Sequence, residues 1–198
     1  QPFAASSIPL VTLGTFLLWF GWFGFNGFSQ LAMGTFDDVN AISKIAVNTH
    51  LAGAAGTVTG AALTRLIGGK TDIVMMLNGS LAGLVAITAE PLTPGPITAM
   101  VIGSIGAVIM YYGTKLLENL GLDDVVGAIP VHMFAGIFGT LVVPLTNAGT
   151  SFGTQLIGVI SVCVFSFVLS WITFSTLKST VGLRISRAAE KQGTDKAE

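Results

Sequence analysis

The first charged side chain in this sequence is Asp37, so residues 1–36 form a run without a single formal charge. Most of this run is apolar, and a helix needs about 20 mainly apolar residues to cross the hydrocarbon core of a bilayer. Comparable apolar runs recur along the chain, in which 10% of the residues are charged, whereas soluble domains carry about 25%. This pattern predicts an all-α membrane protein.

Charged residues, prolines and glycines divide the chain into six apolar segments of helical length. The clearest break holds Pro91, Pro94 and Pro96, because proline cannot continue a helix. We therefore predict six transmembrane helices, a membrane domain over residues 1–180, and a polar tail over residues 181–198. The predicted helices cover residues 8–33, 39–67, 72–89, 97–117, 125–145 and 152–180.

Six spans leave both ends of the chain on one side of the membrane. Eight of the nine lysines and arginines fall on that side, and Lys44 falls on the other. Basic residues are enriched in cytoplasmic loops, so we expect the chain to lie in a cell membrane with both ends in the cytoplasm. The tail would then be available to a soluble regulatory partner, although a disordered end explains its composition equally well.

The rest of the composition argues against several classes of function. A net charge of −1 gives no electrostatic basis for binding nucleic acid. Cys163 is the single cysteine, which excludes an internal disulfide and a cysteine-rich metal site. The sequence contains no phosphate-binding loop, metal-ligand spacing or nucleophile–base pair. We therefore expect no enzyme activity, no metal and no cofactor.

Residues 18–29 hold two tryptophans and four phenylalanines, with a glycine at every third position from 21 to 27. Residues three apart share a helix face, so these glycines leave one side open to the close approach of another helix. Phe25 lies near Ser29, and an aromatic face beside a hydroxyl can hold a small cation. The alternative is an aromatic belt at the membrane surface, in which the glycines serve packing.

Two histidines lie inside predicted helices. His132 follows Asp124 by eight residues, which at 1.5 Å per residue places it about 12 Å inside the membrane. An ionisable group at this depth is costly and commonly lines a pathway, although a neighbouring helix could also hold it. His50 follows Asn48 and Thr49 at a similar depth. His50 could relay protons with His132, but interhelical hydrogen bonding explains this polar cluster more simply.

Acidic and small residues at other positions have structural explanations. Asp123 and Asp124 precede an apolar helix, where carboxylates cap free backbone N–H groups. Glu90, which directly precedes a proline, is expected to be a solvated loop residue. Asn78 and Gly79 indicate close helix packing.

Several segments resemble the ammonium transporter (Amt/Mep/Rh) family, and they occur in the family's order. Residues 18–26, followed by Ser29, resemble its sixth spanning helix. Residues 47–49 resemble the seventh helix, 78–88 the eighth, 123–139 the tenth, and 182–186 the start of the cytoplasmic tail. The likeness covers essentially the whole chain.

The resemblance implies a fold and a set of site residues. The family has eleven spanning helices, assembles as trimers with one pore per subunit, and builds ten helices as two inverted halves. This chain would be the second inverted repeat plus the last helix. Phe25 would be a gating phenylalanine, Trp22 its neighbour in the pore wall, Ser29 a contact for ammonium outside, and His132 one of the paired pore histidines.

The implied function is ammonium transport. NH4+ is recruited outside and deprotonated, and NH3 passes through an apolar pore that penalises ions. Two rivals stay open: an ammonium sensor that couples the same fold to cytoplasmic signalling, and an inert fragment that inserts but binds nothing.

The sequence also departs from the family. The first five helices, with the partner of His132, are absent, and Gln1 is not a start methionine, so we expect a piece of a longer protein. Gly127 stands where many members have aspartate, five residues before the pore histidine. Phe28 replaces a small residue beside the recruitment serine, which predicts a narrower vestibule.

Overall fold

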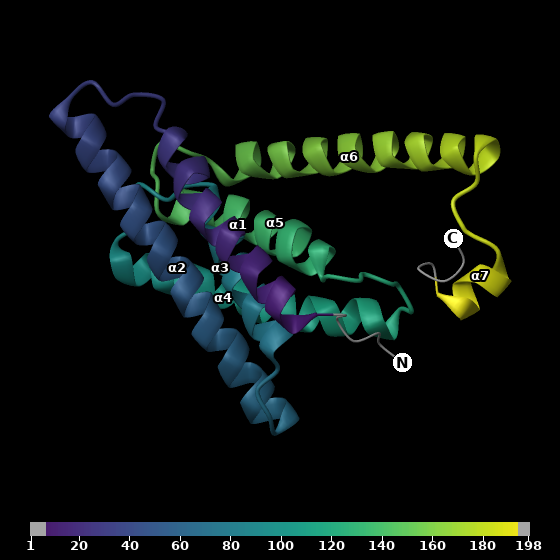
Figure 1. Cartoon of the computed structure of the whole chain (residues 1–198). Helices are drawn as coiled ribbons and strands as arrows, with labels where there is room; N and C mark the ends of the chain where they lie inside the picture. Colours follow the sequence, from purple (N-terminus) through teal and green to yellow (C-terminus); the bar gives the residue numbers. More distant parts are fainter. Residues whose placement is uncertain (1–6, 194–198) are drawn as a thin grey trace. The chain divides into compact units, whose positions relative to one another are not determined.

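The computed structural model describes residues 7–193, and all regular secondary structure in this range is helical (Figure 1). The chain divides into two compact units, one ending at Leu156 and the other beginning at Ile157. The helices are α1 (Ile8–Phe28), α2 (Phe36–Gly68), α3 (Ile73–Thr88), α4 (Pro96–Asn119), the π-helix η1 (Ile129–Phe134), α5 (Ala135–Val142), the 3-10 helix η2 (Val143–Leu145), α6 (Phe152–Thr180) and α7 (Arg187–Gln192).

Local sequence explains where α2 begins and ends. At its start, the Thr35 hydroxyl accepts from the backbone N–H of Asp38, and the Asp38 carboxylate accepts from the N–H of Thr35. This reciprocal capping box satisfies two N–H groups that have no partner within the helix. At its end, Gly69 takes a φ of 77°, a left-handed conformation that glycine adopts without steric penalty.

The first predicted helix is shorter than the sequence indicated. We predicted a helix over residues 8–33, but α1 ends at Phe28. Leu31 has a φ of 60°, which is incompatible with a continuing right-handed helix. Residues 29–35 therefore form the connection to α2, and Ser29 lies at the helix end instead of inside the helix.

The predicted helix over residues 125–145 is three consecutive helical segments, η1, α5 and η2. Gly127 has a φ of 72°, so the helix begins after it. The Asp124 carboxylate accepts from the N–H groups of Ala128 and Ile129, each at 2.8 Å, which confirms the predicted capping role of Asp124. His132 lies in the π-helical turn.

Helices α2, α3 and α4 pack together, and glycines allow the close approach of α2 and α3. A Cβ built on Gly79 would lie 2.7 Å from the carbonyl oxygen of Gly56, and one on Gly60 would lie 2.9 Å from that of Met75. Both distances are too short for real contacts, so only glycine fits. The glycine pattern in the sequence indicated this kind of packing.

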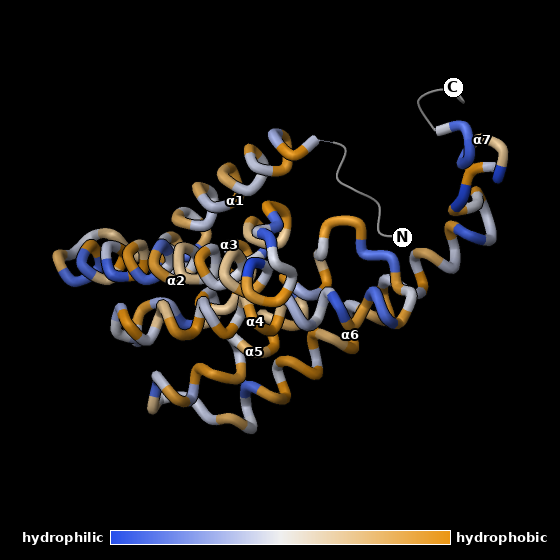
Figure 2. Tube along the Cα trace, turned by 90° about the horizontal axis from the view of Figure 1, so that it is seen from below, coloured by the Kyte–Doolittle hydropathy of each residue, from blue (hydrophilic) through white to orange (hydrophobic). Residues whose placement is uncertain are grey.

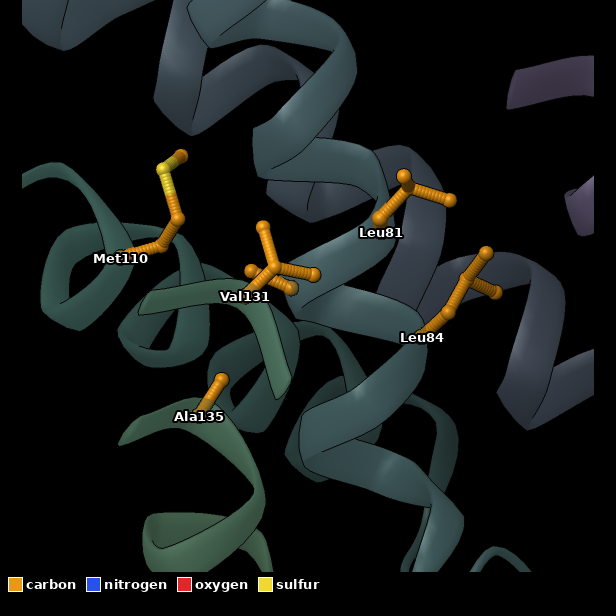
Figure 3. Packing of buried hydrophobic residues seen from close by; sticks show 6 residues of the cluster. Leu81, Leu84, Met110, Val131 and Ala135 are labelled. Atoms are coloured by element: carbon orange, nitrogen blue, oxygen red, sulfur yellow. The ribbon is translucent and has the colours of Figure 1, made fainter. Parts of the chain in front are cut away.

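A cluster of buried side chains joins α3 and α4 to the helical segment that carries His132 (Figure 3). Val131, next to His132, is 1% exposed and packs in this cluster. The cluster thus fixes the position of η1 against α3 and α4. Its buried members are Leu81 and Leu84 of α3, Met110 of α4, Val131 of η1 and Ala135 of α5, together with Ala82.

Each of the six segments predicted to span the membrane contains helix. By length and apolar composition, α1, α4 and α6 are able to cross a membrane. The α3 helix, with 16 residues, is shorter, and α2 is long but carries charged residues near both ends. Hydrophobic residues dominate α6, whereas hydrophilic ones gather in α7 (Figure 2).

Candidate functional site

Trp22, Phe25 and Ser29 all lie at the C-terminal end of α1 or directly after it. The rings of Trp22 and Phe25, one helical turn apart, meet edge to face with 6.1 Å between their centroids. Aromatic pairs favour this geometry because the positive ring edge meets the negative ring face. The Phe25 side chain is 62% exposed, so the described part of the chain leaves most of this ring uncovered.

An open hollow of about 490 Å³ lies beside Phe25 and Ser29. Two of the three glycines on one face of this helix, Gly21 and Gly24, supply part of its lining, so backbone is accessible there. Within residues 7–193, no charged side chain lines the hollow. The lining residues are Gly21, Gly24, Phe25, Phe28, Ser29 and Leu31.

The Ser29 hydroxyl has a defined orientation in this hollow. It donates its hydrogen to the carbonyl oxygen of Phe25, at 2.7 Å. A hydroxyl has one hydrogen and two acceptor lone pairs, so Ser29 has only acceptor capacity left for a ligand. Its oxygen therefore suits a donor such as N–H, in a hollow that Phe25 and Phe28 also line.

Two side-chain hydrogen bonds hold this end of α1 against its neighbours. The indole N–H of Trp22 donates to the Thr88 hydroxyl of α3 at 2.7 Å. The amide of Asn26, which is 2% exposed, donates to the Thr49 hydroxyl of α2 at 3.0 Å. Neither pairing was predicted from the sequence, because the partners are 66 and 23 residues apart and no local pattern connects them.

One ring nitrogen of His132, Nδ1, bonds to the backbone, and the other, Nε2, does not take part in that bond. Its Nδ1 lies 3.0 Å from the carbonyl oxygen of Ala128. A carbonyl can only accept, so in this hydrogen bond Nδ1 carries the hydrogen, and Nε2 of the neutral ring bears the lone pair. The side chain is exposed within the described chain, which leaves Nε2 accessible to a ligand or a proton.

The polar cluster around His50 divides into two kinds of contact. Asn48 donates to the carbonyl oxygens of Pro91 and Pro94, at 2.8 and 2.9 Å, and Thr49 accepts from Asn26. The Asn26–Thr49 bond is an interhelical contact of the kind predicted for this cluster, whereas the bonds from Asn48 reach the loop after α3 and were not predicted. The His50 ring instead packs against the rings of Trp19 and Phe23 of α1, with centroids 5.5 and 6.2 Å away.

The environment of Gly127 explains why this position is glycine. Besides its positive φ, a Cβ built here would lie 2.7 Å from the amide nitrogen of Asn78. That amide donates to the carbonyl oxygen of Val126 at 3.1 Å. Asn78 therefore occupies the space that a side chain at position 127 would need, and it braces the backbone just before η1.

Glu90 lies in the loop after α3, as the sequence predicted, but the residue is only partly exposed and its carboxylate is hydrogen-bonded within the chain. One carboxylate oxygen accepts from the backbone N–H groups of Leu92 and Thr93, and the other accepts from the Asn147 amide at 2.9 Å. The bond to Asn147 was not predicted, because the two residues lie 57 positions apart in the sequence. The carboxylate joins the loop after α3 to the loop after η2.

Comparison with known proteins identifies the family to which the chain belongs. A sequence model of the Ammonium Transporter Family matches residues 1–198. The chain is 41% identical to ammonium transporter Amt2 of Archaeoglobus fulgidus over 212 residues, covering 97% of this chain and 44% of the relative. It is 38% identical to a putative ammonium transporter of Synechocystis, covering 98% of this chain and 37% of the relative.

Solved structures agree with this assignment. A protein described as a sensor Amt protein superposes with a TM-score of 0.88 at 35% identity, covering 98% of this chain and 49% of that one. Mep2 of Candida albicans superposes with a TM-score of 0.82 at 26% identity, covering 92% and 44%. The chain thus spans about half the length of the proteins it matches, or less. On the family match and these identities, the chain belongs to the ammonium transporter family.

Proposed function

We propose that this chain supplies part of the wall of a pore that recruits ammonium and conducts ammonia. Family membership supports the substrate class. The observation that carries the proposal is the exposed Phe25 ring beside the acceptor oxygen of Ser29, in a hollow without charged side chains. Ammonium is a small cation with N–H donors and no acceptor, which matches both features.

Recruitment would combine two weak attractions. The faces of Phe25 and Phe28 attract a cation through the ring quadrupole, and Ser29 accepts one N–H from the ion. Because no carboxylate of the described residues lines the hollow, the cation would be held by dipoles and could be released again. A transport site needs binding that is favourable enough for entry and weak enough for exit.

Passage would require loss of the charge. Phe25 covers the entrance, and an apolar path beyond it penalises every ion. NH4+ therefore enters the path as NH3 after giving up one proton. His132 offers Nε2 as the acceptor for such a proton, since Nδ1 is already bonded to Ala128. The proton would then travel by a route that includes the histidine, separately from NH3.

The arrangement in the membrane follows from the same proposal. We propose six spans with both ends in the cytoplasm, forming the second inverted repeat and the last helix of an eleven-helix fold that assembles as a trimer. The segment from Val181 would be a cytoplasmic tail that meets a regulatory protein. An ammonium sensor is the second candidate, because one of the similar structures is described as a sensor Amt protein.

Ammonium flux into liposomes tests the proposal, using the native protein that contains this chain. Ser29→Ala should raise the half-saturating ammonium concentration by roughly ten-fold to a hundred-fold, since a hydrogen bond to a charged group contributes roughly 1.5–3 kcal/mol. Ser43→Ala is the matched control, because Ser43 also bonds to the carbonyl oxygen four residues earlier but lies on α2.

The outcomes separate the rival functions. Saturable flux in the wild type, weakened by Ser29→Ala alone, supports transport. Ammonium binding without flux favours the sensor. If the wild type shows neither flux nor a change of thermal stability in detergent with ammonium, the chain is inert and the proposal is wrong.

A further inference from the structure

We propose that Thr88 is a positioning residue that sets the orientation of Trp22 and, through Trp22, that of the Phe25 ring at the pore entrance. This inference rests on the proposed function for its effect on transport. The positioning itself rests on contacts within the unit that ends at Leu156. Thr88 is the last residue of α3 and of the segment 78–88 that resembles the family's eighth helix, and the sequence assigned it no role of its own.

The Thr88 hydroxyl donates one hydrogen bond and accepts another, and neither bond can be reversed. The Thr88 hydroxyl donates to the carbonyl oxygen of Leu84 at 2.6 Å, and its oxygen accepts from the Trp22 indole at 2.7 Å. A hydroxyl has one hydrogen and an indole nitrogen can only donate. The Thr88 hydrogen is used in the bond to Leu84, so the Thr88 oxygen accepts the hydrogen of the Trp22 N–H. The bond to the helix backbone also fixes the position of this acceptor oxygen.

The indole ring of Trp22 contacts Phe25, so its orientation affects the position of the Phe25 ring. Trp22 packs against the buried cluster that contains Leu81 and Leu84, so one part of the ring is held by apolar contact. The indole also forms the edge-to-face pair with Phe25, at an interplanar angle of 78°. A rotation of the indole would break its hydrogen bond and remove the ring that supports Phe25.

A second contact keeps the helix itself in place. Asn26, directly after Phe25, is buried and bonds to Thr49 of α2. The backbone of α1 is therefore anchored at this turn independently of Thr88. Loss of the Thr88 hydroxyl should change the setting of the Trp22 and Phe25 rings without detaching α1.

The positioning contact can be tested without any transport measurement. Thr88→Val removes the hydroxyl and leaves the Trp22 N–H without its acceptor, whereas Thr88→Ser restores an acceptor. Thr57→Val is the matched control, because the Thr57 hydroxyl also bonds to the carbonyl oxygen four residues earlier, that of Gly53 at 2.9 Å. If Thr88→Val does not fold, Thr88→Ala gives the same comparison.

Ultraviolet resonance Raman spectroscopy reports the hydrogen bond of the indole N–H. The Trp22 signal is isolated by subtracting the spectrum of a matched Trp22→Phe protein. We expect the N–H-sensitive band to shift toward that of a weaker hydrogen bond in Thr88→Val and to stay in place in Thr88→Ser and Thr57→Val. An unshifted band in Thr88→Val overturns the inference.

Liposome flux then tests the consequence for the entrance. The ratio of ammonium to methylammonium flux should change roughly five-fold in Thr88→Val, the size expected for the loss of about one hydrogen bond. Thr88→Ser and Thr57→Val should keep the wild-type ratio. An unchanged ratio in a conducting Thr88→Val protein refutes the role of Thr88 and leaves the proposed function intact. If the wild type does not conduct, the proposed function fails, and the Raman shift still decides whether Thr88 positions Trp22.

Discussion

The Nδ1 atom of His132 lies 3.0 Å from the carbonyl oxygen of Ala128, inside a π-helical turn. This hydrogen bond occupies Nδ1 and leaves Nε2 available for a ligand or a proton. π-helical turns are rare and occur frequently at functional sites. Here the turn follows a left-handed glycine and contains Pro130, whose ring nitrogen cannot donate a hydrogen bond.

If His132 is the proton acceptor that we propose, His132→Ala should remove that acceptor from the pore wall. We expect the proton-linked current to fall by about a hundred-fold or more, since a positioned acid or base contributes roughly 10² to 10⁴ in rate. Current and flux are measured together on liposomes. His50→Ala is the control and should keep the current, because the described ring contacts of His50 are with α1. An equal loss in both variants would instead support a relay between the two histidines.

If Phe25 covers the pore entrance as we propose, Phe25→Ala should open that entrance. We expect faster passage of methylammonium relative to ammonium, because a smaller side chain admits the larger ion. Phe16→Ala is the control. Phe16 is also a mostly exposed ring on α1, but it lies nine residues before Phe25 and therefore on the opposite face of the helix. Identical selectivity in Phe25→Ala and the wild type would count against the gating role.

Gly79→Ala should destabilise the protein by about 1–3 kcal/mol, the usual cost of adding a methyl group to a tightly packed interface. The added Cβ would meet the backbone oxygen of Gly56, which cannot move aside as a flexible side chain can. Gly14→Ala is the control, because nothing lies within 4 Å of a Cβ there. Thermal unfolding in detergent should separate the two variants, and equal melting temperatures would show that α2 and α3 can move apart easily.

Asp38 should make the start of α2 sensitive to acid. Hydrogen bonds from the side chain and then the backbone of Thr35 hold the pKa of this carboxyl below its ordinary value. A lowered folded pKa means that the stabilisation is complete above the unfolded pKa of about 3.9 and is lost as the pH falls through the folded pKa. An NMR titration of the Asp38 carboxyl should give a midpoint that rises in Thr35→Ala. A midpoint that is the same in both proteins would exclude Thr35 as the cause.

Much of the helical architecture could be predicted from the sequence, because its causes are local. The capping box of Thr35 and Asp38, the left-handed Gly69 and the cap at Asp124 each involve residues within a few positions of one another. The apolar runs between them give the helices. Predictions failed where a backbone angle was not visible in the residue type, as at Leu31, which ends α1 early.

The contacts that shape the candidate site were decided only by tertiary structure. Glu90 bonds to Asn147 and Trp22 to Thr88, over 57 and 66 residues of sequence. A hydroxyl or carboxylate can accept from many donors, so residue type alone does not identify its partner. The apolar runs and local caps of this sequence determined that it forms helices. The packing of α1 on α2 and α3 decided which polar groups of these helices meet. The physical reason is that a hydrogen bond forms only where the backbone brings donor and acceptor within about 3 Å.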